Sequence, residues 1–345
     1  MVAYHVWDAL ASSKNLSDIS GVRVRPADFF FPTRVEQDGS QRDKMIEIMA
    51  SGVRGFRHDA NIIQERGVNK AYGAVDAYEH LAPVIDTDVC MNFLKDLVAS
   101  KGAKMVTRTV KGDLFDQEQP LLDEFQADVI VNATGLSGAE VAGDKSCYPI
   151  RGALIRVIND GTDFPKLDRA LTISADVAGE IVFLVPRNDD ILLIGGITEP
   201  NQHELDLTLD SPIIKRMRTR CEEFLPDLRK ARLDPDYPLA QGLRPFRQKN
   251  IRLERELRIH EPGTGLGKQS SPSRIIHNYG HGGAGWSLSF GCAADVLVLV
   301  EEALQDHLPQ AMRVDVGVSK VPNLVHASKK FPEAQKLHSY VKARL

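Results

Sequence analysis

The chain contains few of the residues that mark several common classes of protein. Its 345 residues include four cysteines, namely Cys90, Cys147, Cys221 and Cys292. None of them forms a CxxC pair, so neither a metal site nor a disulfide framework is indicated. The first residues also lack the charged start, apolar stretch and small-residue cleavage site of a signal peptide. These absences favour a reducing compartment, and we expect the cytoplasm unless a targeting signal directs the protein elsewhere.

Charge and hydropathy exclude further classes. The net charge of −4 at pH 7 and the lack of a basic stripe argue against nucleic acid as a partner. No apolar run approaches the roughly 20 residues that a bilayer-spanning helix needs, so we expect no membrane partner. The hydrophobic content of 43% is typical of a globular protein, and the length predicts two domains. Whether the chain forms a homodimer stays open at this point.

The glycine-rich stretch in residues 275–292, IIHNYGHGGAGWSLSFGC, is the most informative feature. Four glycines follow a strand-like apolar run and precede a long apolar segment. Because glycine has no Cβ, backbone here approaches a flat ligand closely, and a helix that begins just afterwards directs its positive end at that ligand. An ordinary turn between strand and helix would carry the same glycines, so the glycines alone leave both interpretations open.

Periodicity along the chain predicts an α/β fold. Residues 88–100 have apolar side chains at helical spacing. Residues 22–31, with an aromatic run before Pro32, and residues 104–109 are strand candidates. Residues 127–135 resemble a buried strand that ends in a turn of small residues, which is typical of a parallel α/β sheet. Between about 151 and 265 the pattern changes to short β runs, at 152–158, 181–185 and 191–197, separated by polar turns. We therefore expect a β-rich block inserted into an α/β domain.

Four segments, in order, resemble one family, the D-amino-acid oxidases, which are FAD-dependent flavoproteins. They are VIVNATG at 129–135, LLIGGI at 192–197, GLRPFR at 242–247 and IIHNYGHGGAG at 275–285. The resemblance covers nearly everything from about residue 50 to 306. It implies an α/β fold in which an incomplete Rossmann-like FAD-binding domain accompanies an antiparallel β-rich substrate domain.

The resemblance also implies domain boundaries. The FAD-binding-like domain would comprise residues 86–150 and 266–306, the substrate domain residues 1–85 and 151–265, and a C-terminal extension residues 307–345. Near its start the chain shows no G-x-G-x-x-G, the turn that opens the flavin-binding βαβ unit of this family. We therefore expect that this unit is missing.

The resemblance assigns the FAD contacts to two segments. The residues implied are Asn132, Thr134, Gly135, Gly280, His281, Gly282, Gly283, Ala284 and Gly285. The first three would line the far end of the cofactor, although termination of a strand explains such residues equally well. The others would lie along the flavin ring, where the start of the next helix favours the anionic reduced flavin.

Substrate recognition is implied for three residues. Arg244 would clamp the substrate carboxylate through two hydrogen bonds, and the alternative is a structural ion pair with Glu254 or Glu256. The carbonyl group of Gly283 would accept a hydrogen bond from the substrate amine. Phe183 stands where the family usually has tyrosine, so it keeps an apolar wall and loses one hydrogen bond to the carboxylate.

The reaction implied is the oxidative deamination of a D-amino acid by O2 to keto acid, ammonia and H2O2. Hydride passes from substrate to flavin, so no catalytic side chain is predicted. The last residues, Ala343-Arg344-Leu345, resemble a peroxisomal address, which suits a producer of peroxide. Because of the missing G-x-G-x-x-G, the alternative is a truncated, non-catalytic relative that does not bind FAD.

Overall fold

The computed structural model describes residues 2–174, 180–261 and 270–311. The proposed peroxisomal address and most of the predicted C-terminal extension lie outside the described residues, so both stay predictions. The helices of the described chain are α1 (Val2–Leu10), α2 (Lys14–Ser20), α3 (Gly39–Ala50), α4 (Ile62–Glu65), α5 (Thr87–Ser100), α6 (Glu118–Phe125), α7 (Gly138–Val141), α8 (Pro212–Phe224) and α9 (Gly285–Leu304), with 3-10 turns η1 (Val35–Gln37), η2 (Lys70–Tyr72), η3 (Gly135–Ser137), η4 (Pro226–Lys230) and η5 (Gly282–Ala284).

The strands fall into three sheets. They are β1 (Val22–Phe31), β2 (Arg57–His58), β3 (Asp76–Ile85), β4 (Ile130–Asn132), β5 (Cys147–Ile158), β6 (Ala170–Ser174), β7 (Glu180–Pro186), β8 (Ile191–Ile197), β9 (Glu199–Pro200), β10 (Leu239–Arg247), β11 (Arg252–Arg255), β12 (Ile259–His260), β13 (Ser271–Pro272) and β14 (Ile275–Tyr279). The predicted strands in the β-rich block, at 152–158, 181–185 and 191–197, are confirmed as parts of β5, β7 and β8.

The chain forms two compact units. Among the described residues, the first contains 3–105, 150–174 and 180–243, and the second contains 106–149, 244–261 and 270–311. These boundaries differ from the expected ones at 86 and 266. Helix α5 belongs to the first unit because it packs against α2, and the last four residues of the GLRPFR segment, 244–247, belong with the glycine loop. The assignment of one unit to FAD and one to substrate stays a prediction.

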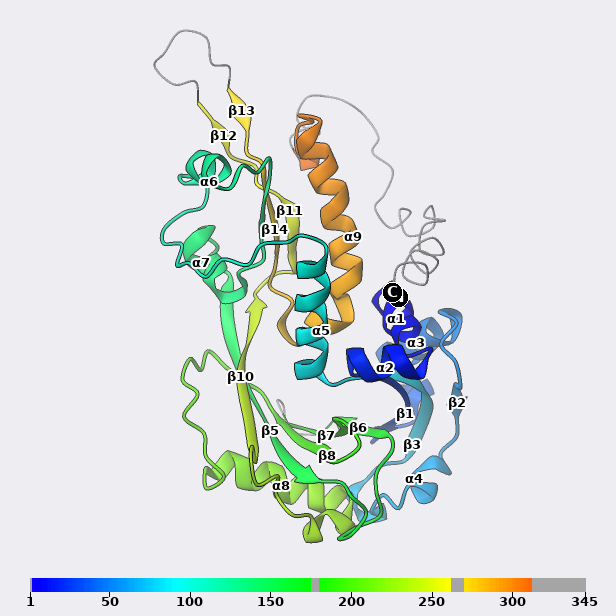
Figure 1. Cartoon of the computed structure of the whole chain (residues 1–345). Coiled ribbons are helices and arrows are strands. Elements are labelled where there is room, and N and C mark those ends of the chain that lie inside the picture. Colours follow the sequence, from blue (N-terminus) through cyan, green and yellow to red (C-terminus); the bar gives the residue numbers. More distant parts are fainter. Residues whose placement is uncertain (1, 175–179, 262–269, 312–345) are drawn as a thin grey trace. The chain divides into compact units, whose positions relative to one another are not determined.

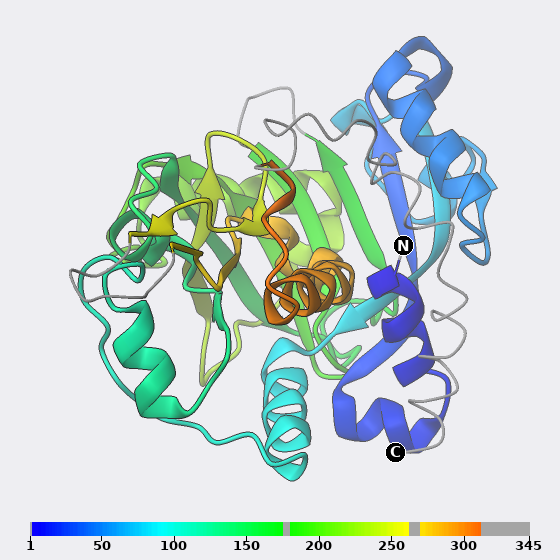
Figure 2. The same cartoon turned by 90° about the horizontal axis from the view of Figure 1, so that it is seen from above.

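A large sheet dominates the first unit. Its strands follow the order β10-β5-β8-β7-β6-β1-β3-β2, with β9 paired to β5. Most neighbours run antiparallel, and β1 with β6 is a parallel pair. Every residue of β8 is buried, because β8 lies between β5 and β7 and under α8. Figures 1 and 2 show α8 across one face of these strands.

The second unit is built around a small sheet of three strands, in the order β11-β14-β4. Strands β14 and β4 run parallel, with His277 opposite Asn132, which is the parallel pairing expected from an α/β pattern. Helix α9 packs on β11 and β14 (Figure 1). The core beneath it is formed by Ile276, Val296 and Ala303. Thus the glycine loop joins the strand β14 to the helix α9.

The prediction of a strand at residues 104–109 was wrong. Residues 103–111 have no regular structure, and Met105 and Val106 are 59% and 65% exposed. A β run becomes a strand only when a neighbouring backbone pairs with it, and no described strand pairs with this segment. The local pattern alone did not contain that information.

The expectation of no apolar run of membrane-spanning length was also wrong. Residues 282–304 form a helical stretch of 23 residues, in which a window of 18 residues has a mean hydropathy of 1.5, so the stretch is long and apolar enough by length and composition to cross a membrane. The core helices of soluble proteins pass the same test, so one such helix is weak evidence. Only 11% of this window is buried in the described protein, so α9 exposes much apolar surface. The glycines and serines at its start made the run look interrupted.

Candidate functional site

An open cavity of about 430 Å³ lies in the second unit, where three segments meet. The segments are the turn after β4, the end of β10 and the loop between β14 and α9. The lining residues are Ala133, Gly135, Arg244, Pro245, Asn278, Tyr279, Gly280, His281, Gly282, Gly283, Gly285 and Trp286. Two motifs that are far apart in the sequence, GLRPFR and the glycine loop, therefore form one site.

The cavity gathers most, but not all, of the predicted site residues. Asn132, Thr134 and Ala284 lie beside lining residues and do not line the cavity themselves. Phe183 lies on β7 in the first unit and is 36% exposed, and its role as an apolar wall stays a prediction. Asn278 and Trp286 line the cavity and were not predicted to do so, although both stand within the motif that was singled out.

The four glycines of the loop fall into two pairs, and glycine has a different physical role in each pair. Gly280 and Gly282 adopt φ values of 86° and 56°, in the left-handed region that favours glycine. A Cβ at Gly280 would lie 2.5 Å from Cδ of Arg247, and one at Gly282 would lie 2.6 Å from the ring of Phe246. Both positions therefore require glycine because β10 packs against them. The interpretation as an ordinary turn explains these two glycines.

The other two glycines leave room at the cavity. The nearest atom to a Cβ on Gly285 would be 4.0 Å away, and on Gly283 it would be Cδ of Arg244, at 3.6 Å. Arg244 and Gly283, two of the three residues predicted to bind the substrate, are therefore neighbours. A close approach of ligand to backbone is possible at both glycines.

The cavity favours a negatively charged ligand. Its lining residues, all in the described part of the chain, include Arg244 and His281 and no acidic residue. Burial lowers the pKa of Arg244, but a guanidinium stays charged at any ordinary pH. Burial also lowers the pKa of His281 and so favours its neutral form. Helix α9 begins here with no acidic residue in its first turn and no side-chain cap on Ala284 among the described residues, so its N–H groups add positive potential.

Next to the lining residues in sequence, three buried polar side chains form a chain of hydrogen bonds. Asn132 and His277 are in contact at 3.2 Å, and Nε2 of His277 lies 3.2 Å from Oε2 of Glu256. All three residues are less than 5% exposed. Burial alone would raise the pKa of Glu256, but hydrogen bonds from His277 and Arg258 hold it well below its usual range. Glu256, at one end of this chain of hydrogen bonds, thus carries a permanent negative charge.

A second polar cluster holds the end of β14. The hydroxyl of Tyr279 donates to Asp144 at 3.0 Å and accepts from Arg252 at 2.9 Å, while Nε of Arg247 donates to Asp144 at 2.7 Å. Burial alone would raise the pKa of Asp144, but hydrogen bonds from Ser146, Tyr279 and Arg247 lower it to about 2. Burial raises the pKa of Tyr279 to about 12. These bonds tie β10 to β14 beside the cavity.

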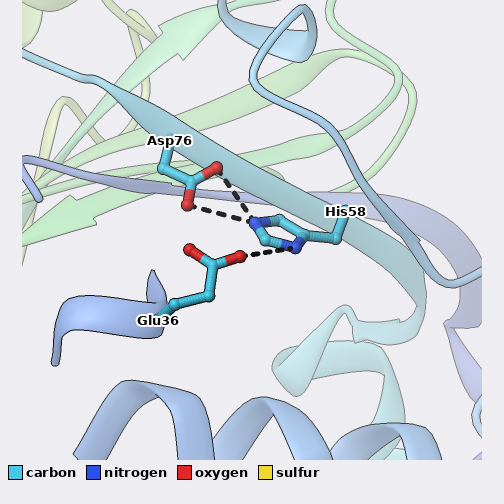
Figure 3. A group of neighbouring side chains, drawn as sticks. All are labelled: Glu36, His58 and Asp76. Atoms are coloured by element: carbon cyan, nitrogen blue, oxygen red, sulfur yellow. Dashed lines mark hydrogen bonds and ion pairs between the residues drawn. The ribbon is translucent and has the colours of Figure 1, made fainter. Parts of the chain in front are cut away.

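A third group, Glu36, His58 and Asp76, lies in the first unit (Figure 3). Nε2 of His58 lies 3.0 and 3.1 Å from the two oxygens of Asp76, and Nδ1 lies 3.7 Å from Glu36. Each ring nitrogen thus faces a different carboxylate, and Asp76 also accepts from the backbone of Val35 at 2.9 Å. This arrangement fits a bridge between η1 and the strands β2 and β3 better than a set of metal ligands.

Comparison with known proteins identifies the family. Residues 14–297 match the family described as FAD dependent oxidoreductase, DAO. The chain belongs to this family. The prediction from the four motifs is thereby confirmed, and FAD is the cofactor of the family.

Individual relatives agree with this assignment. The D-amino-acid oxidase of Rubrobacter xylanophilus is 33% identical over 234 residues, which are 67% of this chain and 62% of the relative. The D-amino-acid oxidase of Dictyostelium discoideum is 31% identical over 238 residues, 69% of this chain and 59% of the relative. The chain therefore spans about three fifths of the length of these relatives.

The fold has solved counterparts. The glycine oxidase of Geobacillus kaustophilus superposes with a TM-score of 0.62 and 17% identity, covering 87% of this chain and 77% of that one. At this identity the likeness establishes the fold alone. The predicted α/β architecture with a large antiparallel sheet is confirmed.

The residues of the cavity fit a flavin ring. Gly283 and Gly285 leave space against the backbone, and the first turn of α9 suits a ring that becomes negative on reduction. The amide oxygen of Asn278 is buried and has no hydrogen-bond partner among the described residues, so a ligand N–H group would satisfy it. An orphaned acceptor, open glycines and an uncapped helix start together provide the kind of donors and acceptors that FAD requires.

Proposed function

We propose that this protein binds FAD against the glycine loop and oxidises a D-amino acid to the imino acid, which hydrolyses to keto acid and ammonia. The observation that carries the proposal is that Arg244 lies beside Gly283 in a cavity whose lining residues include no acidic side chain. An amino acid presents one carboxylate and one ammonium group to such a site. Arginine and a backbone carbonyl are suited to bind these two groups.

The protein's own groups bind and orient the substrate. The guanidinium of Arg244 would hold the carboxylate through two parallel hydrogen bonds, and its partial burial would strengthen them. The carbonyl oxygen of Gly283 would accept a hydrogen bond from the amine. Bound FAD would supply the two-electron acceptor, and O2 would restore its oxidised state with release of H2O2. No side chain is needed as a base, because the α-hydrogen leaves the substrate as hydride.

The first experiment is an FAD titration followed by visible absorbance, then an oxygen-consumption assay with a panel of D-amino acids. Arg244→Lys should lower kcat/KM by about 10- to 100-fold, because lysine keeps the charge and loses the bidentate geometry. Arg274→Lys is the matched control, since Arg274 pairs with Asp306 and does not line the cavity. Equal losses in the two variants would remove Arg244 from substrate binding.

A second candidate is a relative that keeps the fold and does not bind FAD. The observation that favours it is the exposed apolar surface of α9, the helix that begins at the cavity. The same titration separates the candidates. Flavin bands that stay with the protein after gel filtration support the oxidase, and free FAD alone supports the non-catalytic relative.

A further inference from the structure

The orientation of the Asn132 amide follows from its neighbours. Its Oδ1 lies 3.2 Å from the backbone nitrogen of Thr134 and 2.7 Å from the hydroxyl of the same residue. A backbone N–H group only donates, so the oxygen of the amide has to face Thr134. The amide nitrogen of Asn132 therefore faces His277, and it donates to Nδ1 at 3.2 Å.

The tautomer of His277 follows in turn. Because Nδ1 accepts from Asn132, the ring proton resides on Nε2, which donates to Oε2 of Glu256. Both oxygens of the Glu256 carboxylate accept further hydrogen bonds. Its Oε1 accepts from the backbone of Leu257 at 2.8 Å, and its Oε2 also accepts from Arg258 at 2.8 Å. The hydrogen bonds thus run in one direction, from Thr134 to Asn132, from Asn132 to His277 and from His277 to Glu256.

This chain of bonds connects the two walls of the cavity. Asn132 precedes Ala133 and Gly135, which line one wall, and His277 precedes Asn278 and the glycine loop, which line the other. His277 and Asn132 are also opposite each other in the parallel pair of β14 and β4. His277 is 0% exposed, so water cannot replace a lost partner.

We infer that His277 and Glu256 are positioning residues, which set the geometry of the cavity walls through the direction of the hydrogen bonds to Asn132. Their effect on FAD rests on the proposed function. Reversing the direction of the hydrogen bonds between His277 and its two partners should rotate the amide of Asn132 and place its N–H groups against the N–H of Thr134. The turn that carries Ala133 and Gly135 would then shift, and the cofactor site with it.

The test compares variants that reverse, preserve or remove the hydrogen bonds of His277 with a control at a neighbouring carboxylate. Glu256→Gln introduces a donor opposite His277, whereas Glu254→Gln removes a neighbouring carboxylate that bonds Arg252 instead. His277→Gln preserves the direction, because the amide N–H replaces Nε2–H and the amide oxygen replaces Nδ1. His277→Leu keeps a side chain of similar size and removes all bonding. This last variant serves if Glu256→Gln does not fold.

Two measurements decide the outcome. In the wild type, side-chain 15N spectra should show His277 protonated at Nε2, and in Glu256→Gln at Nδ1. The FAD dissociation constant should rise about tenfold in Glu256→Gln and His277→Leu, and stay within about twofold in Glu254→Gln and His277→Gln. Protonation at Nδ1 in the wild type, or an unchanged FAD affinity in Glu256→Gln despite a reversed tautomer, would overturn the inference.

A failure of the proposed function gives a different result. If the wild type binds no FAD, Trp286 still reports on the wall, since it lines the cavity. In a Trp7→Phe background its emission is the sole tryptophan signal, because the chain has two tryptophans. The emission maximum should move in Glu256→Gln and His277→Leu and stay fixed in Glu254→Gln and His277→Gln. An emission that moves equally in all four, or in none, would contradict a positioning role.

Discussion

The two units of this protein are stabilised in different ways. In the first, one continuous apolar cluster runs from Phe30 through β5 to β8 and into α8. In the second, the described clusters contain three buried residues each, and the polar residues from Asn132 to Glu256 are buried as well. A large apolar core stabilises a fold without fixing the orientation of any one side chain. Buried hydrogen bonds fix such orientations, but a buried polar group that loses its partner is costly to stability.

The difference bears on where function lies. The cavity proposed to bind FAD and substrate is in the unit with the smaller described apolar clusters. Its geometry depends on directional contacts such as Arg247 with Asp144 and Asn132 with His277. Each of the following predictions tests whether the two units respond differently to comparable changes. Trp7 and Trp286 serve as separate probes, since each unit contains one tryptophan.

The largest effect is expected in the apolar core. Leu184→Ala removes a side chain that is 0% exposed and should lower the free energy of unfolding by about 2–5 kcal/mol. Urea unfolding followed by Trp7 emission in a Trp286→Phe background measures it. The Trp286 transition should move less. Equal shifts of both probes would mean that the units unfold together and that the comparison does not apply to stability.

The next effect is a pH dependence in the second unit. The pKa of Asp144 is lowered from 3.8 to about 2, so its ionised form stabilises the native state above about pH 4. This contribution, about 2 kcal/mol, should be lost as the pH falls from 4 towards 2. The stability difference between wild type and Asp144→Asn, measured by Trp286 emission, should therefore shrink over this range. A constant difference would show that the charge of Asp144 is not what matters.

A smaller effect is expected under α9. Val296 is 9% exposed and belongs to a cluster of three buried residues, so Val296→Ala should cost about 1–2 kcal/mol. Urea unfolding followed by Trp286 emission in a Trp7→Phe background is the measurement. A loss as large as that of Leu184→Ala would show that the small core is packed as tightly as the large one.

The smallest effect is expected at Leu297, the residue after Val296. Leu297 is 64% exposed, so Leu297→Ala should change the free energy of unfolding by no more than about 0.5 kcal/mol. The same urea experiment at two protein concentrations provides the check. A loss that matches Val296→Ala would indicate that this side of α9 is covered in solution.

Much of the first unit could be predicted from local pattern. The aromatic run before Pro32 predicted a strand at 22–31, which is β1, and the apolar run LLIGGI predicted β8. The candidate at 104–109 failed because strand formation depends on a distant partner. Local pattern therefore sufficed where a segment's own burial decides its structure.

The site could be predicted in its parts and not in its connections. The motifs identified Arg244 and Gly283, and the structure brings them together. Their roles, and that of Phe183, stay predictions. The bond between Asn132 and His277 joins residues 145 positions apart, and no local pattern contains such a pairing. Likewise, only the packing of Phe246 shows why Gly282 has to be glycine.

The chain passes from one unit to the other at residues 105, 149 and 243, and this has a consequence for biosynthesis. Strand β1 leaves the ribosome early, yet the strand that pairs with it on its parallel side, β6, begins at Ala170. At ordinary rates of translation the interval between β3 and β6 is on the order of ten seconds. Throughout that time β1 is without its neighbour β6, and Phe30 is without Phe224, against which its ring packs. A nascent chain of this kind is a natural client for ribosome-associated chaperones, and its yield in a heterologous host should depend on their supply.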